Sequence, residues 1–232
     1  MIYLLLIMLL KVDWGRDEGI FENPATSMEG VLFSYQRLFN VIDLFQIDYG
    51  GKFGDTRIGA GIEALTESPY NELTLSFSYG RIIHGLLWGA GFNYYFVNCE
   101  EYGTGGAIGL NMGIKYQRSN WDFHFSILNF NSPHLWKSEI PVKIVGKAGA
   151  KVTDRFYFSI YSLKEGGFPL DVQYSVNAKL SEIINLRFRI GTNPVSFGIG
   201  FNFIYNKMCF DFFFRFNQFL GFSEIITIKH SL

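Results

Sequence analysis

The stretch from Val195 to Phe203 reads Val-Ser-Phe-Gly-Ile-Gly-Phe-Asn-Phe. Bulky apolar residues alternate along it with small or polar ones. Because successive side chains of a β-strand point to opposite faces, this period of two predicts a strand with one apolar and one polar face. Residues 108–117 repeat the pattern, with Ile, Leu, Met, Ile and Tyr alternating with Gly, Asn, Gly, Lys and Gln.

The same alternation restarts between turn residues from Val31 to the C-terminus and predicts about fourteen strands. These lie at residues 31–37, 44–53, 56–65, 72–81, 85–97, 105–117, 119–129, 142–151, 154–162, 171–180, 183–191, 195–205, 207–216 and 221–230. Short connections are predicted at 54–55, 118–120, 153–154 and 206–207, and longer ones at 66–71, 98–104, 131–141 and 163–170. Short turns at one end and longer loops at the other are typical of an outer-membrane barrel.

Bulky side chains occupy one face of most predicted strands, such as Phe210, Phe212, Phe214 and Phe216, while the other face carries the charges. In a soluble barrel the apolar face fills the interior, and about eight strands leave just enough room for that. About fourteen strands enclose more space, so we expect the apolar face to contact lipid and the charges to line a polar lumen. The alternative is a large soluble β-sandwich, in which an aromatic, charge-free face on nearly every strand would be unusual.

The predicted fold class is therefore all-β: a single closed antiparallel transmembrane β-barrel over residues 31–232. Its predicted location is the bacterial outer membrane. Residues 1–30 form a separate N-terminal segment in this interpretation. Its apolar run at 2–10 resembles the core of a secretory signal, although a first strand or a plug segment is the alternative.

Two short helices are predicted outside the strands. The first covers Pro24–Glu29, because Asn23 can cap it and Pro24 suits a first helical turn. Asn23, Pro24 and Ala25 are accordingly predicted to form a stiff plug or gate at the end of the lumen. The second helix is predicted in the Ser132–Ser138 loop.

Twelve residues are predicted to face the lumen: Arg57, Glu63, Lys115, Asp122, His124, Lys143, Lys147, Asp171, Arg187, Arg189, Asp211 and Arg215. Opposite charges across a lumen pair with one another or select a solute, and we expect pairing for most of them. The inward face also carries Tyr95, Tyr157, Tyr161 and Phe213, which favours an occluded interior.

No catalytic or cofactor site is predicted. The four histidines are scattered without the spacing of metal ligands, and no Ser, His and acidic residue come together on one rim. We therefore expect neither an enzyme nor a cofactor. A net charge of −1 without a basic stripe argues against nucleic acid as a partner. Cys99 and Cys209 are interpreted as two separate thiols rather than a disulfide.

Several segments resemble the PorV/PorQ-type family of outer-membrane proteins, which is akin to the fourteen-stranded FadL-type fatty-acid transporters. Residues 21–26, Phe-Glu-Asn-Pro-Ala-Thr, are similar to the family's F-x-N-P-A-x segment. Other similar segments are 110–116 followed by 127–130, 187–192 followed by 197–200, and 220–223 before the last strand. The resemblance implies a fourteen-stranded barrel with an N-terminal segment in or under the lumen.

Three functions follow as hypotheses. The first is transport of small solutes, hydrophobic ones among them, across the outer membrane. The second is a non-transporting protein-interaction barrel, such as a type IX secretion-system component or cargo shuttle, with a secretion-system or other envelope protein as partner. The third is a structural envelope protein. In each case the lipid bilayer is the predicted environment.

Overall fold

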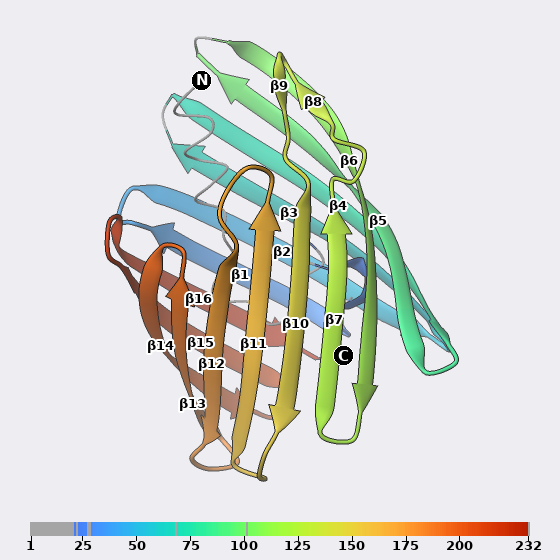
Figure 1. Ribbon diagram of the computed structural model, residues 1–232, viewed down its shortest axis with the longest axis vertical. Helices are drawn as coiled ribbons and strands as arrows, with labels where there is room; N and C mark the ends of the chain where they lie inside the picture. Colours follow the sequence, from blue (N-terminus) through green and yellow to red (C-terminus); the bar gives the residue numbers. More distant parts are fainter. Residues whose placement is uncertain (1–20, 22, 27–28, 68, 101, 232) are drawn as a thin grey trace.

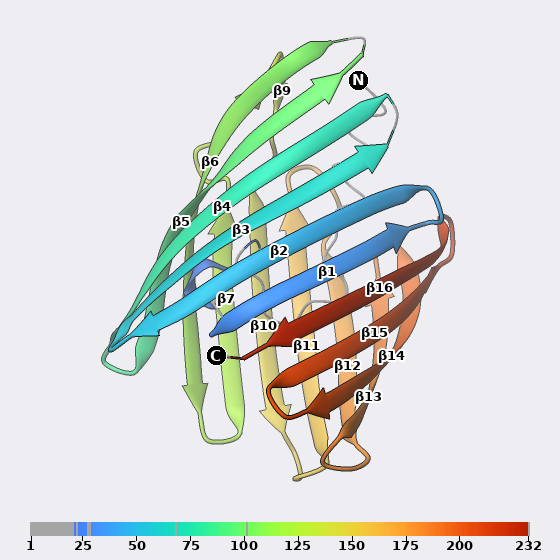
Figure 2. The ribbon, with the colours of Figure 1, turned by 180° about the vertical axis from the view of Figure 1, so that it is seen from behind.

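The computed structural model describes residues 21, 23–26, 29–67, 69–100 and 102–231, and most of them form one closed antiparallel β-barrel of fourteen strands (Figure 1). Consecutive barrel strands are hydrogen-bonded neighbours throughout. The first strand also pairs with the last, Val31 lying opposite His230, which closes the barrel (Figure 2). Closure leaves no sheet edge running the length of the wall, the arrangement that a membrane-spanning sheet needs.

All fourteen predicted strands are present, and the predicted and observed bounds differ only at the strand ends. The barrel strands are β1 (Gly30–Leu38), β2 (Ile42–Phe53), β3 (Thr56–Glu67), β4 (Tyr70–Ile83), β5 (Leu86–Cys99), β6 (Gly103–Arg118), β7 (Trp121–Leu128), β10 (Lys143–Lys151), β11 (Phe156–Glu165), β12 (Asp171–Lys179), β13 (Ile184–Thr192), β14 (Val195–Tyr205), β15 (Met208–Asn217) and β16 (Gly221–His230).

The two ends of the barrel differ. One end carries the turns at 54–55, 84–85, 119–120, 152–155, 180–183 and 206–207, and we call it the turn end. The opposite end, the loop end, carries the long β7–β10 connection and the shorter connections between the other strand pairs. Two of the four longer loops that the sequence predicts, around residues 68 and 101, are short because β3 to β6 extend further than predicted.

Both helix predictions need correction. No α-helix is present among the described residues, and the start of the predicted 24–29 helix is a single 3-10 turn, η1 (Pro24–Thr26). Residues 27 and 28 lie outside the described part. The predicted 132–138 helix is instead a small hairpin of β8 (His134–Leu135) and β9 (Ser138–Glu139). It folds this way because Leu135 and the following Ile140 are both buried under the barrel rim.

No helix in the described part of the chain is long and apolar enough to cross a membrane.

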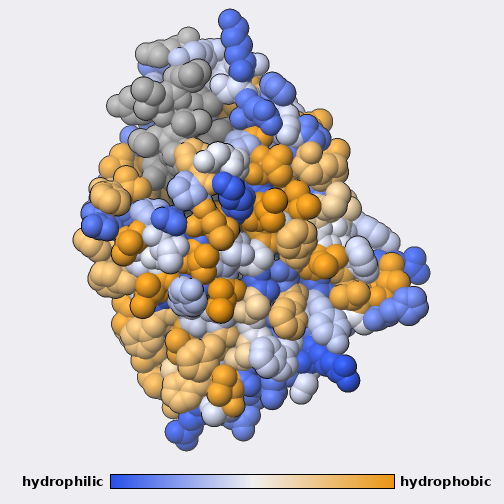
Figure 3. Space-filling view, viewed as in Figure 1, coloured by the Kyte–Doolittle hydropathy of each residue, from blue (hydrophilic) through white to orange (hydrophobic). Residues whose placement is uncertain are grey.

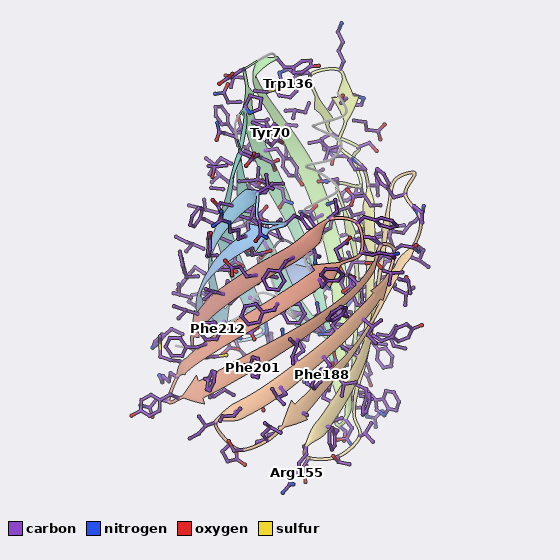
Figure 4. The ribbon with its side chains drawn as sticks, turned by 90° about the vertical axis from the view of Figure 1, so that its left-hand side faces the viewer. Tyr70, Trp136, Arg155, Phe188, Phe201 and Phe212 are labelled. Atoms are coloured by element: carbon purple, nitrogen blue, oxygen red, sulfur yellow. The ribbon has the colours of Figure 1, made fainter. Side chains whose placement is uncertain are left out.

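The strands have two distinct faces. On β14, Ser196, Gly198 and Gly200 are buried in the interior, whereas Val195 and Phe197 are exposed. Large apolar side chains are exposed on nearly every strand, and in Figure 3 they cover much of the visible face, while hydrophilic residues gather at its upper, right-hand and lower edges. Phe188, Phe201 and Phe212 lie on the outer wall of β13–β15, between Trp136 at one end and Arg155 at the other (Figure 4). This apolar exterior fits a lipid environment.

Candidate functional site

The candidate site is the barrel interior. Of the twelve predicted lumen residues, four are buried (Glu63, Asp171, Arg189 and Arg215) and eight are half-buried (Arg57, Lys115, Asp122, His124, Lys143, Lys147, Arg187 and Asp211). None of the twelve is exposed. The barrel distributes them into separate groups along its axis and does not bring them into one site.

One group surrounds Asp122 on β7. Its two carboxylate oxygens contact the hydroxyl of Tyr157, which donates a hydrogen bond, and Nε2 of His124 at 3.2 Å. In the strand register Lys115 on β6 and Lys147 on β10 lie directly opposite His124 on either side. The three basic side chains therefore form one row across neighbouring strands, with Asp122 beside it.

A second group lies on β13 and β15. Nη1 of Arg187 donates to Oδ2 of Asp211 at 3.2 Å, and both side chains are largely shielded from solvent. The guanidinium of Arg189 lies 5.5 Å from the ring centre of Phe213. That ring occupies the space over Gly198 and Gly200 on β14, where a Cβ on either glycine would collide with it. Ion pairing is thus the observed arrangement for Arg187 and Asp211.

The interior holds a cavity of about 100 Å³, which we call the chamber. One side is apolar, formed by Leu128, Val145 and Leu163 with Tyr161 packed against them. The other side is polar and includes Glu63, Glu72, Thr74, Asn93, Tyr95 and Asn129. Lys143 and Glu165 form an ion pair at the chamber wall, with Nζ and Oε1 3.2 Å apart. Sequence periodicity indicates which side chains point inward, but it does not reveal this cavity.

A chain of hydrogen bonds crosses the polar side of the chamber. Ser76 donates to Asn93 Oδ1, and Asn93 Nδ2 donates to the hydroxyl of Tyr95. That hydroxyl donates to Asn129 Oδ1 at 2.9 Å, and Asn129 Nδ2 contacts the carbonyl of Pro141. Asn129 follows directly after β7 and lies in the left-handed region, with a φ of 56°, which asparagine tolerates better than most residues. The chain ties the β7–β10 connection to the wall formed by β4 and β5.

An apolar cluster closes the loop end above the chamber. It joins interior side chains of β1 to β6 with the β7–β10 connection: Leu38, Ile42, Leu44, Leu65, Tyr70, Val97, Cys99, Ala107, Leu135 and Ile140. Ile140 also lines the chamber, so the cluster is its roof. These residues were not among the predicted site residues. The sequence does mark these residues, because the alternation of apolar and polar residues breaks down locally. At Ala64-Leu65 and Phe96-Val97, for example, two successive residues are apolar, so both faces of the strand are apolar there.

The N-terminal residues Asn23 to Ala25 are buried in the interior. Asn23 Nδ2 donates to the carbonyls of Ile114 and Phe125, at 3.3 and 3.4 Å, and its Oδ1 accepts a hydrogen bond from the amide of Ala25. The segment lies over glycines of the wall. A Cβ on Gly89 would meet the Ala25 nitrogen at 2.3 Å, and one on Gly113 would meet Asn23 Oδ1 at 2.0 Å. The glycines thus make the room that this segment occupies.

The turn end has a wider, more polar opening of about 390 Å³, lined by Asp122, Tyr157, Asn177, Lys179 and others. Exposed ion pairs stand at its rim, Lys151 with Asp154 and Lys179 with Glu182, each at 2.7 Å. The hydrogen bond from Lys151 holds the pKa of Asp154 below its ordinary value. The two ends of the interior are therefore chemically different, apolar at the loop end and polar at the turn end.

No group of three or more His, Cys, Asp or Glu among the described residues could hold a metal ion. Both cysteines are free, Cys99 in the apolar cluster and Cys209 half-buried beside Asn202. The predicted separate thiols are confirmed.

No family model and no curated protein match the sequence. Several solved structures share the fold. A structure titled CymD monoaromatic hydrocarbon channel has a TM-score of 0.65 and 13% identity, with 92% of each chain covered. The Pseudomonas putida toluene transporter TodX has a TM-score of 0.62 and 9% identity, covering 92% of this chain and 93% of TodX. The KdgM porin has a TM-score of 0.52 and 5% identity, covering 88% and 99%.

These likenesses establish the fold as that of outer-membrane barrel channels, in agreement with the apolar exterior and the predicted outer-membrane location. The fold is shared with channels, a transporter and porins. Kinship with the PorV/PorQ-type family and with FadL-type barrels stays a prediction.

Proposed function

We propose that this protein passes small solutes, hydrophobic ones among them, across the outer membrane in the manner of FadL-like and PorV-like barrels. The observation that carries the proposal is the chamber itself, which has an apolar roof on one side and the N-terminal segment on the other, Phe21 being part of its lining. A solute crossing the barrel passes both. In this proposal Asn23, Pro24 and Ala25 are the gate, and the twelve lumen residues form the polar wall of the passage.

The gate can be tested without deleting it. Gly89→Ala places a Cβ where the backbone of Pro24 and Ala25 now lies, so the segment must move. We expect solute flux into proteoliposomes, measured by swelling, to rise several-fold over the unaltered protein. Gly167→Ala is the matched control, because nothing lies within 4 Å of the added Cβ.

Deletion of the residues before Gly30 is the complementary experiment. We expect the barrel to fold, as judged by heat-modifiable migration on gels, and the flux to rise as it does for Gly89→Ala. If both variants fold and flux remains at background, the gate hypothesis is wrong, and the result favours the hypothesis of a protein-interaction barrel. If the deletion prevents assembly, the segment is structural.

One observation favours the second function, a protein-interaction barrel. Apolar side chains stand exposed on the neighbouring β1–β2 and β15–β16 connections at the loop end, with Val41 59% and Phe219 77% exposed. The Phe39 amide in the first connection donates a hydrogen bond to Ser223 Oγ near the start of β16, directly after the second connection. Exposed apolar side chains at the rim, above a lumen that the apolar cluster covers, favour a docking surface for an envelope or secretion-system protein. Flux at background in both gate variants is the result that would favour it.

A further inference from the structure

Strand β6 extends further toward the loop end than its neighbour β7 does (Figure 1). β7 pairs with residues 112–118 of β6, whereas β5 pairs with β6 along the whole stretch 103–111. Among the described residues, this first part of β6 therefore has a neighbouring strand on one side alone. The closed barrel thus keeps a short open sheet edge at residues 103–108, which we call the β6 edge.

The end of the open stretch nearest to β7 is already occupied, by a group that imitates a strand. The amide of Phe130 donates to the carbonyl of Leu110 at 3.0 Å. The side chain of Asn131 then accepts from the amide of Leu110 and donates to the carbonyl of Ile108, both at 2.8 Å. One side-chain amide thus makes the bonds that a backbone amide of a neighbouring strand would make. These contacts show that this side of β6 accepts a peptide-like partner where β7 stops.

The β6 edge continues this row of hydrogen-bonding groups. Alternate residues of an antiparallel strand direct their N–H and C=O groups to the same side. The bonds of Leu110 and Ile108 lie on the side away from β5, so the backbone groups of Gly106 and Thr104 point there as well. No described residue makes a hydrogen bond to these groups or to the N–H of Ile108. Because Thr104 and Gly106 are exposed, a further strand can reach them.

The β6 edge lacks the features that protect open edges in natural proteins. Such edges are blocked by charged side chains, by proline or by a bulge. Residues 103–108 read Gly-Thr-Gly-Gly-Ala-Ile and include neither a charge nor a proline. Free backbone groups are excluded from the hydrocarbon of a bilayer, so this edge stands at the loop end in contact with water. An unprotected edge of this kind is a template for an added strand.

The two faces beside the β6 edge differ in chemistry. On the outer face Ile108 is 53% and Phe130 is 42% exposed. On the inner face a Cβ on Gly105 would meet Trp136 Nε1 at 2.9 Å, so the indole lies against the strand. This buried indole nitrogen has no acceptor among the described residues. An added strand would therefore place apolar side chains beside Ile108 and oxygen acceptors toward Trp136.

The tilt of the strands decides against a second copy of this chain as the partner. Copies in one membrane share one orientation, and the strands of outer-membrane barrels tilt by about 35–45° from the membrane normal. Two β6 edges related by a twofold axis along that normal would therefore cross at about 70–90°, twice the tilt. Strands that share a ladder run nearly parallel or antiparallel. The added strand consequently comes from a different protein.

We propose that the β6 edge binds an extended segment of another protein by β-strand addition, antiparallel to β6 and in the place that a longer β7 would take. The segment carries apolar side chains at every second residue, which pack beside Ile108 and Phe130, and polar ones between them. The inference goes beyond transport, because it concerns a surface at the loop end and holds whether or not a solute passes through the lumen.

The test uses a fluorescently labelled octapeptide of alternating valine and threonine, which supplies an extended backbone with one apolar and one polar face. Fluorescence anisotropy with the full chain in detergent measures its affinity. We expect the octapeptide to bind. The same peptide N-methylated at every residue keeps the side chains but has no backbone donors, and it should bind at least about tenfold more weakly.

Gly106→Pro is the matching change in the protein. Proline removes the N–H that points to the β6 edge and puts its ring there, while the bonds to β5 come from the neighbouring residues. We expect the affinity for the octapeptide to fall at least about tenfold. Gly106→Ala is the control, because it keeps the N–H and its Cβ has its closest contact with the Tyr94 hydroxyl oxygen, at 3.0 Å. If Gly106→Pro does not fold, Thr104→Pro near the start of the strand takes its place with the same expectation.

No binding of the octapeptide, equal affinities of the two peptides, or equal affinities of the proline and alanine variants would overturn the proposal. Light scattering tests the excluded partner, and we expect a monomer. A dimer that Gly106→Pro dissociates would make a second copy the occupant and would also overturn it. Since none of these measurements depends on flux, the failure of transport and the failure of strand addition are told apart.

Discussion

Replacing Phe213 with alanine is expected to lower the free energy of unfolding by about 3–5 kcal/mol, the usual cost of removing a buried phenylalanine. Phe213 is 0% exposed although it lies on the inward face of β15. Its ring fills the space above Gly198 and Gly200, which carry no side chains of their own. Alanine leaves that space empty and also removes the contact with the Arg189 guanidinium.

Urea unfolding of the protein refolded into liposomes measures this effect. Phe219→Ala is the matched control, since Phe219 is 77% exposed in the β15–β16 turn and its loss should cost well under 1 kcal/mol. A Phe213→Ala variant as stable as Phe219→Ala would mean that the ring does not pack inside the barrel.

Phe212→Arg, one residue away and on the opposite face, is the second large effect that we expect. Phe212 lies in the outer wall, paired with Phe201 and Ile226 on its neighbours (Figure 4). An arginine on the lipid face costs about 2–4 kcal/mol near the bilayer midplane and about 0–1 kcal/mol near the interfaces. We therefore expect Phe212→Arg to lower the free energy of unfolding by about 2–4 kcal/mol in the same experiment.

The position along the strand provides the control. Tyr205→Arg introduces the same charge at the end of β14, beside the turn, where the exposed side chain reaches the interface. It should cost about 0–1 kcal/mol. Equal costs at Phe212 and Tyr205, or a loss at Phe212 no larger in liposomes than in detergent micelles, would contradict a lipid-facing outer wall.

The fold was predictable from the sequence because its signal is local. Each strand carries its own alternation, as in Val195 to Phe203, and turn residues such as Gly54-Asp55 separate the runs. The orientation of the faces follows from the number of strands and from where the charges lie. None of these inferences needs to know which strand lies beside which.

The two helix predictions were wrong because the conformation of these segments depends on contacts with distant parts of the chain. Pro24 suits a first helical turn, but a turn that must fit against Gly89 and Gly113 is shaped by the wall. In the β7–β10 connection, burial of Leu135 under the rim decided the conformation, and local propensity could not reveal that burial.

The candidate site depends on register, which periodicity does not specify. Tyr95 and Asn129 are 34 residues apart and meet because β5, β6 and β7 are staggered. Arg187 reaches Asp211 across β14, where Gly200 lies opposite Arg187 and leaves room for its side chain. The sequence predicts that such charges face inward and pair. It does not indicate which carboxylate borders the chamber.

The central claim, a barrel whose apolar face meets lipid and whose polar face lines the interior, is tested most directly by spin labels placed one at a time along β14. With Cys99 and Cys209 replaced by serine, labels at residues 195–205 other than Gly198 and Gly200, where Phe213 leaves no room for a side chain, are exposed to oxygen, which partitions into lipid, and to a water-soluble nickel complex. We expect oxygen accessibility to peak at the odd positions, including 197, 199 and 201, and to fall at 196 and 202. The opposite phase, or no period of two, would contradict the account.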